Sequence, residues 1–236
     1  MNTIVLSLAS FLLTTTPQVA ASVPGYAVTV ALFNDARVPQ NALAGAQKTA
    51  SYIFSKSGID IHWMLCGRED ESPEERSACS QPEFPAHLEV HIVSGCPRLP
   101  TSVFGISYLS PEGIGSQADV FYARIAAFRQ SPAELSTVLG YAMAHELGHL
   151  LLGTNSHSPT GLMRADWRTK DLTDMAQGGL VFSQEQAQRM KVKLSTLALR
   201  KESSQGRPSA GPLANAPKLC KKGQFRPLLP SNPAFN

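Results

Sequence analysis

Alternating apolar and polar positions predict several β-strands in the first half of the chain. From His87 to Val93 the apolar residues Leu88, Val90 and Ile92 fall on one face, and β-branched residues recur from Tyr26 to Phe33. A period of two residues is typical of a strand with one buried face. Three further strands are predicted, over Asp60–Leu65, Ser102–Leu109 and Asp119–Ile125.

Apolar positions three and four residues apart predict three helices. The first covers Val38 to Ser57. The second begins after Ser131, where Ser-Pro-Ala-Glu has the pattern of a capping box with proline at the first helical position, and it ends near Leu152 before Gly153. The third begins after Ser183, which precedes Gln186 by three residues, and ends near Leu199. Residues 67–85 and 153–182 show no helical period and are expected to be irregular.

This order of elements predicts one α/β (α+β) domain with helices against a mixed, mostly parallel sheet of about five strands. A hydrophobic content of 43% in 236 residues is enough for one such domain and excludes general disorder. We expect the domain to cover residues 22–200. Residues 201–236 contain six prolines and are expected to form a mostly irregular, basic tail.

The first 21 residues have the pattern of an export signal. An apolar run from Ile4 to Leu13 is followed by polar residues and then by Val-Ala-Ala, which predicts cleavage after Ala21. No Lys or Arg precedes the run, so a buried first element is the alternative. The export interpretation predicts a secreted or periplasmic protein.

Four cysteines agree with export, because an even number in an exported chain indicates disulfides. Cys66 and Cys79 flank one charged segment and are expected to pair with each other. That would leave Cys96 to pair with Cys220, although the sequence alone allows other pairings.

Charge and hydropathy exclude two classes of partner. From Arg200 onward there are seven basic residues and one acidic residue, so this end of the chain has a charge of +6. Because the whole chain has a net charge of +3, the remaining residues sum to −3. A slightly acidic domain with a basic, Pro-rich tail does not indicate nucleic-acid binding. No apolar run reaches the roughly 18–20 residues of a membrane-spanning helix, so no stable membrane insertion is expected.

The second predicted helix contains His145-Glu146-Leu147-Gly148-His149. Residues four apart lie on one face of a helix, so both imidazoles can reach one metal ion. Glu146 points to the same side and can take a proton from water without being a ligand. This pattern predicts a catalytic Zn²⁺ ion.

A catalytic zinc site needs a third protein ligand and an open position for water. His157, eight residues after His149, is the nearest candidate, because the chain can turn back after Gly153. Glu185 on the following predicted helix is the rival. His62 and His91 lie on or beside predicted strands, where a structural role is expected.

These residues resemble the signature of the zincin metallopeptidases, and the longer pattern resembles the metzincin clan. In this chain the pattern is His145, Glu146, His149, Gly153 and His157, followed by a methionine, Met163, in a segment whose Pro and Gly suit a turn. The spacing departs from the clan, in which the glycine follows the second histidine by three residues and the third histidine by six. The resemblance implies a methionine beneath the metal and a final helix after it.

The resemblance also implies the activity. The chain would be a small secreted zinc metalloendopeptidase. It would bind its peptide or protein substrate as an extended strand added to the edge formed by residues 102–109. Glu146 would be the general base, and the protein is expected to be a monomer. A zincin-fold binding protein with little or no catalysis is the alternative, and a module whose histidines are structural is a further one. No oxyanion-stabilising side chain is identified; Tyr141 is expected to lie on the wrong side of its helix, and only Tyr122 is conceivable.

Overall fold

The computed structural model describes residues 26–80, 87–128 and 132–204. Residues 1–21, expected to be a signal sequence, the expected capping residue Ser131 and residues 205–236 with Cys220 lie outside the described residues. No helix within the described ranges is long and apolar enough to cross a bilayer.

Five strands form one sheet in the order β2-β1-β3-β5-β4. They are β1 (Tyr26–Phe33), β2 (Ile59–Cys66), β3 (His87–Val93), β4 (Gly105–Tyr108) and β5 (Gln117–Phe121). All neighbours pair in parallel except β4, which is antiparallel to β5 and forms one edge. The predicted α/β class and the mostly parallel five-stranded sheet are therefore confirmed.

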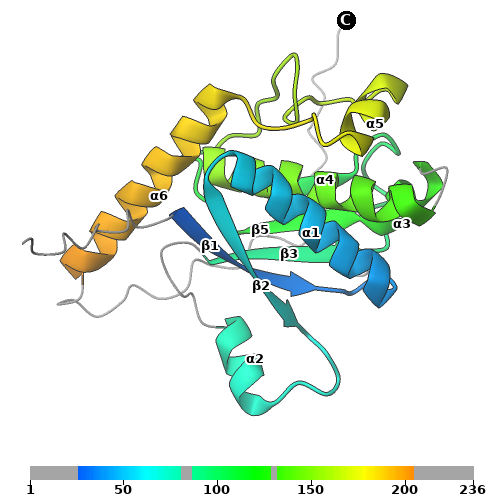
Figure 1. The fold of residues 1–236 in the computed structure, drawn as a ribbon. Helices are drawn as coiled ribbons and strands as arrows, with labels where there is room; N and C mark the ends of the chain where they lie inside the picture. Colours follow the sequence, from blue (N-terminus) through cyan, green and yellow to red (C-terminus); the bar gives the residue numbers. More distant parts are fainter. Residues whose placement is uncertain (1–25, 81–86, 129–131, 205–236) are drawn as a thin grey trace, which may run out of the picture.

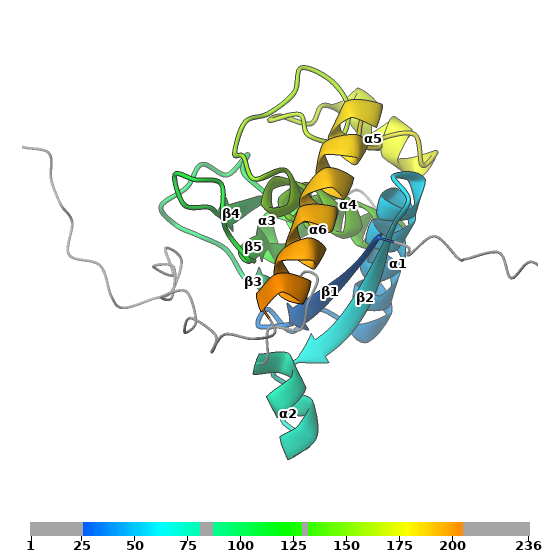
Figure 2. The ribbon, with the colours of Figure 1, turned by 90° about the vertical axis from the view of Figure 1, so that its left-hand side faces the viewer.

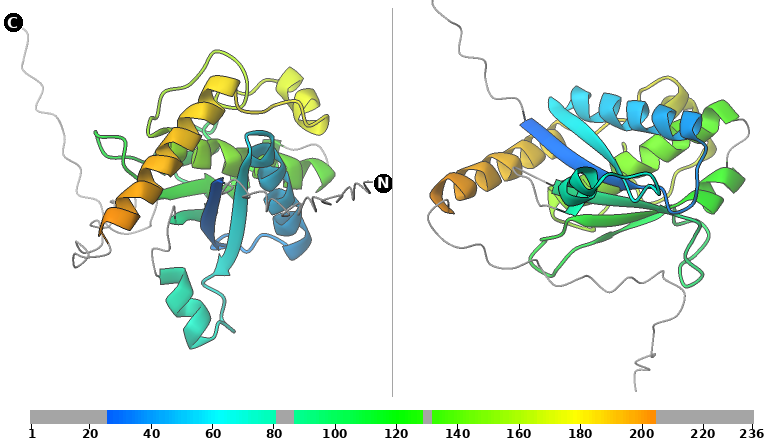
Figure 3. Two further views of the ribbon diagram at one scale, coloured as in Figure 1. Left: turned by 60° about the vertical axis from the view of Figure 1, so that its left-hand side comes forward. Right: turned by 90° about the horizontal axis from the view of Figure 1, so that it is seen from below.

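Helices α1 (Gln40–Lys56) and α4 (Pro132–Leu152) cover one face of this sheet, as Figures 1 and 3 show. The alternate strand residues that face them form the core, among them Val28, Val30, Val90, Ile92 and Val120, all fully buried. The opposite residues of the same strands, which the pleat turns away from α1 and α4, carry most of the polar side chains. We call this second side the outer face of the sheet.

The last helix, α6 (Gln184–Ser204), lies diagonally beside the end of α4 (Figure 2). It begins as predicted, because the Gln186 N–H donates to Ser183 Oγ while the Ser183 N–H donates to the Gln186 side chain. It continues four residues past the expected end of the domain. Lys193 joins it to α4 by donating to Leu150 O at 2.8 Å and to Gly113 O at 3.2 Å.

Three short helices correct the sequence prediction. α3 (Tyr122–Phe128) replaces the second half of the expected strand Asp119–Ile125, and β4 is shorter than expected. α2 (Pro73–Ser80) and α5 (Thr169–Ala176) lie in segments expected to be irregular. Each is too short for an apolar period to be visible, so periodicity could not have detected them.

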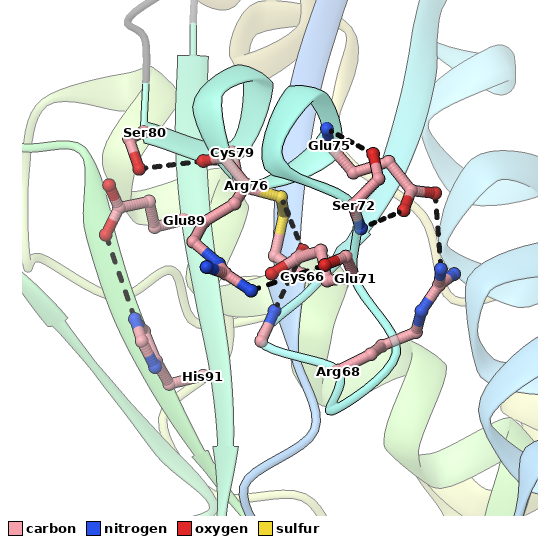
Figure 4. Close-up of a disulfide and its surroundings, with 11 residues drawn as sticks. Cys66, Arg68, Glu71, Ser72, Glu75, Arg76, Cys79, Ser80, Glu89 and His91 are labelled. Carbon is pink, nitrogen blue, oxygen red and sulfur yellow. Dashed lines mark hydrogen bonds and ion pairs between the residues drawn. A yellow bond between two sulfur atoms is a disulfide. The ribbon is translucent and has the colours of Figure 1, made fainter.

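α2 is held by its own cap and by a disulfide (Figure 4). Ser72 Oγ accepts from the Glu75 N–H, and the Glu75 carboxylate accepts from the Ser72 N–H. Cys79, near the end of α2, is bonded to Cys66 at the end of β2, the pairing expected from the sequence, with Cα atoms 5.9 Å apart. Cys96 is also disulfide-bonded.

Candidate functional site

The centre of the site is the C-terminal half of α4, which is buried from Val138 to Leu151. Glycine lets α1 approach it closely: a Cβ atom at Gly140 would come within 2.5 Å of Thr49 Cβ on α1. A helix enclosed in this way is a rigid support, because buried side chains at native packing density have little room to move. The backbone that carries the His-Glu-x-x-His side chains is therefore held in place.

The structure brings the three predicted histidines together. The ring nitrogens that His145, His149 and His157 offer lie within 4.8 Å of one another. His145 Nε2 and His149 Nε2 are 3.0 Å apart, and the His157 ring lies 5.3 Å and 4.9 Å from the other two ring centroids. His145 and His149 are buried, whereas His157 is exposed to solvent. Three nitrogen donors thus converge at the surface end of a buried helix.

Backbone carbonyl groups fix the tautomers of the two buried rings. His145 Nδ1 lies 2.9 Å from Leu162 O, and His149 Nδ1 lies 2.7 Å from Thr154 O. A carbonyl oxygen can only accept, so each Nδ1 carries the proton and each neutral Nε2 presents a lone pair. Both partners are carbonyl groups of the segment that follows α4.

Burial keeps these rings neutral. Together with a smaller contribution from the neighbouring imidazoles, it lowers the pKa of His145 to about 3 and that of His149 to about 4. It also lowers the pKa of His157, although Asp166 opposes that shift. Near neutral pH, two lone pairs therefore face each other across 3.0 Å without a proton between them.

The chain after α4 supplies both the third histidine and the methionine. Gly153 adopts φ = 67°, a left-handed conformation that suits glycine, and its N–H closes the helix on His149 O at 2.9 Å. The segment then returns past His157 to Met163, which is fully buried. A Cβ atom at Gly148 would lie 2.8 Å from Met163 Sδ, so the methionine lies directly against the histidine-bearing turn of α4.

Glu146 is enclosed between α4 and β4. Its carboxylate accepts a hydrogen bond from Ser107 Oγ at 2.7 Å, and the same hydroxyl lies 2.8 Å from Glu146 O. Burial raises the pKa of Glu146 to about 8; the hydrogen bond from Ser107 opposes this shift, and Asp119 adds to it. The carboxyl group is therefore matched to proton transfer near neutral pH.

A cavity of about 660 Å³ opens beside these groups. Its walls come from α4, α3, β4 with the loop before it, and the segment after Met163. Phe104 and Trp167 contact each other from opposite walls, with ring centroids 5.9 Å apart, and Trp167 also lies against His145. Arg124 fixes the wall formed by residues 96–103 by donating to the carbonyl oxygens of Cys96, Leu99 and Val103.

The rival and auxiliary candidates lie elsewhere. Glu185 is exposed at the start of α6 and does not belong to the histidine cluster. Tyr141 donates to Met175 O, on the far side of α4 from the cavity, as expected. Tyr122 is not among the residues that line the cavity. Neither tyrosine is therefore placed to act on a group bound there.

Two residues of the site were missed in the sequence. Ser107 contacts Glu146 across 39 residues of chain, and Trp167 contacts His145 from the segment after Met163. Both belong to segments without a motif of their own. Only the strand expected over residues 102–109, which the metzincin resemblance placed at the edge beside the metal, gave a signal for Ser107.

Comparisons with known proteins give structural likenesses only. No protein-family model matches the chain, and no curated protein matches it either. Among solved structures, a zinc-dependent peptidase from Methanocorpusculum labreanum is similar at 16% identity, with 70% of this chain and 99% of that chain covered and a TM-score of 0.46. An archaemetzincin from Methanopyrus kandleri is similar at 16% identity, with 74% of this chain and 99% of that chain covered and a TM-score of 0.46. Metalloproteinase-II from Bacteroides fragilis is similar at 13% identity, with 74% of this chain and 55% of that chain covered and a TM-score of 0.46. Function must therefore be argued from the geometry of this site.

Proposed function

We propose that this protein is a zinc-dependent metalloendopeptidase of the metzincin type. The observation that carries the proposal is the pair of unprotonated Nε2 atoms of His145 and His149, 3.0 Å apart. Two lone pairs at this distance repel each other unless a cation lies between them. Nitrogens bound to one tetrahedral zinc ion at ~2.0–2.1 Å would be about 3.3 Å apart, close to the distance found.

His157 completes the donor set. Three imidazoles and one open position are a common arrangement in catalytic zinc sites, and neutral imidazole is a ligand that zinc prefers. His145, His149 and His157 would hold the ion, and the carbonyl groups of Leu162 and Thr154 would orient two of these rings. Bound zinc would supply Lewis acidity, which acidifies water and polarises a carbonyl group.

Glu146 would act as the general base. It would take a proton from the attacking water and transfer it to the leaving amine, so that one carboxyl group serves both halves of the hydrolysis. Burial, which raises the pKa of Glu146 in the zinc-free chain, helps the carboxyl group to hold the proton between these two transfers.

The substrate would be a peptide segment in extended conformation. β4 is the edge strand of the sheet and contributes to the wall of the cavity, so a peptide can add to it as a further strand. Main-chain hydrogen bonds would then hold the peptide, and the scissile bond would lie over the histidines. The protein would act as a monomer.

Residues 1–21 would direct this enzyme out of the cytoplasm. The Cys66–Cys79 disulfide supports this part of the proposal, because such bonds persist in oxidising compartments. Sequencing the N-terminus of the exported protein tests it: we expect Ser22, and retention of Met1 would contradict it.

The catalytic proposal is tested with Glu146→Gln and with Glu185→Gln as the matched control. We expect Glu146→Gln to retain one zinc ion per chain and to lose a factor of about 10²–10⁴ in the rate of cleavage of a peptide library. Glu185→Gln should cleave at the wild-type rate. Cleavage by Glu146→Gln at the wild-type rate would overturn the mechanism. Zinc binding by a wild-type protein that cleaves no peptide would favour the alternative, a binding protein of this fold.

A further inference from the structure

In the edge strand β4, the same two residues present main-chain groups to the open edge of the sheet and face α4. Its register pairs Ile106 with Asp119 of β5, and the Phe121 N–H donates to Phe104 O. In an antiparallel pair, hydrogen-bonded positions alternate with positions whose main-chain groups point outward. Phe104, Ile106 and Tyr108 therefore bond to β5, and the main-chain groups of Gly105 and Ser107 point away from the sheet.

The Cβ position of Gly105 and the side chain of Ser107 face α4 rather than solvent. Ser107 is only 5% exposed, and its hydroxyl contacts both the carboxylate and the main-chain oxygen of Glu146. At Gly105 a Cβ atom would lie 2.6 Å from Glu146 Cγ and 2.7 Å from Oε1. Glycine thus leaves the space that the Glu146 side chain fills, and Ser107 holds one of its oxygens.

The hydroxyl of Ser107 has one proton for two acceptors. It lies 2.7 Å from Glu146 Oε2 and 2.8 Å from Glu146 O, so one hydroxyl contacts both the carboxyl group and the main chain that carries it. In the part of the chain that the structure describes, Ser107 is the one side chain that donates to this carboxylate. Ser107 thus contacts Oε2, and Oε1 lies on the side of Gly105.

We propose that Ser107 is a positioning residue that couples substrate binding to the orientation of Glu146; this inference rests on the proposed peptidase function. A peptide strand that pairs with β4 bonds to the main chain of Gly105 and Ser107, and the hydroxyl of the same serine holds the base. Substrate and base are thereby registered to one short segment of backbone. A displacement of about 1 Å in such an arrangement can cost a factor of about 10² in rate.

The test uses Ser107→Ala, Ser107→Thr and a matched control, Tyr108→Phe, in the zinc-loaded full chain. Tyr108→Phe also removes one hydroxyl from β4, but that hydroxyl donates to Asp119 on the outer face of the sheet. We expect Ser107→Ala to lower kcat about 10- to 100-fold with KM within about 2-fold of wild type and with zinc content unchanged. Ser107→Thr should recover most of the rate, and Tyr108→Phe should stay within about 2-fold.

Three results would overturn the inference: an unchanged kcat in Ser107→Ala, a rise in KM alone, or an equal loss in Tyr108→Phe. A wild-type protein that cleaves no peptide would instead defeat the proposed function. In that case crystal structures of wild type and Ser107→Ala decide the positioning role. We expect the Glu146 carboxylate to leave its wild-type position in the variant, and an unmoved carboxylate would refute the role.

Discussion

Two groups of three histidines show how differently one residue type is used in this molecule. His145, His149 and His157 converge beside α4, with their donor nitrogens within 4.8 Å of one another. The others, His62 on β2 with His87 and His91 on β3, lie on the outer face of the sheet and form no such cluster with each other among the described residues. Strand geometry explains the second case. β1 lies between β2 and β3, so His62 is two strand spacings of nearly 5 Å from the histidines of β3, and His87 and His91 are four residues apart along one strand.

The pKa shift of His91 on the outer face is opposite in direction to those of His145 and His149. Burial lowers the pKa of His145 and His149, whose Nδ1 atoms face backbone carbonyls. Burial also lowers the pKa of His91, but hydrogen bonds to Glu89, drawn in Figure 4, and to Asp35 outweigh it, so the pKa of His91 is raised overall. Carboxylates beside a histidine thus favour its charged form, whereas burial beside backbone carbonyls favours the neutral form that can bind a metal.

The largest expected difference between the groups is in zinc affinity. We expect His149→Gln to weaken zinc binding by about 100-fold or more, because it removes one of three nitrogen ligands. His91→Gln should bind zinc as the wild type does. Competition with a chromogenic chelator measures both affinities, and equal affinities in the two variants would contradict the assignment of the site.

Two methionines extend the comparison to packing. Met163 is fully buried against Gly148, so Met163→Ala should lower the free energy of unfolding by about 2–5 kcal/mol in the zinc-free protein. Met64 is partly buried beside the Cys66–Cys79 disulfide on the outer face. Met64→Ala should lower the free energy of unfolding by only about 1 kcal/mol. Urea denaturation measures both. A smaller loss for Met163→Ala than for Met64→Ala would mean that Met163 does not support α4.

Acid should destabilise the zinc-free protein through His145 and His149. Their native pKa values, about 3 and about 4, lie below the unfolded value of about 6.5, so only the unfolded chain takes up protons as the pH falls. Between pH 6.5 and 5.5 we expect the two groups to remove about 2 kcal/mol from the free energy of unfolding. His149→Gln should roughly halve this difference. An identical pH dependence in wild type and variant would refute the assignment of low pKa values.

The smallest effect belongs to His91 and has the opposite sign. Its pKa is raised in the folded protein, so its contribution is complete below the unfolded pKa of about 6.5 and disappears as the pH rises through the native pKa. Relative to wild type, His91→Gln should lose about 0.5 kcal/mol of stability at pH 6 and little at pH 9. A loss that grew with pH would show that the Asp35 and Glu89 contacts do not stabilise the charged ring.

How far the sequence predicted this molecule depended on the range of each interaction. α4 and the start of α6 were predicted because their caps and apolar spacing are local, and the spacing of four between His145 and His149 is a property of any helix. α2 also had a local signal, Ser72-Pro73 with Glu75, which has the form of a capping box but no apolar period beside it. That signal was overlooked for want of a second one.

The rest of the site depends on contacts between distant segments. Ser107 and Glu146 are 39 residues apart, and their contact depends on how β4 packs against α4. His157 was a candidate only by proximity in the chain; what brings its ring to the cluster is the turn at Gly153 and the return of the chain to Met163. Neither packing nor loop path can be read from spacing alone.

If the three histidines beside α4 form a zinc site, the purified protein must hold zinc in a way that depends on His157. We would measure zinc per chain by elemental analysis after dialysis against metal-free buffer, for wild type, His157→Ala and the outer-face control His91→Gln. We expect about one zinc ion per chain in wild type and in His91→Gln, and a strong loss of bound zinc in His157→Ala. Full retention of zinc in His157→Ala would assign the third ligand to another group, such as Glu185. Absence of zinc from the wild type, even after zinc is added, would contradict the account.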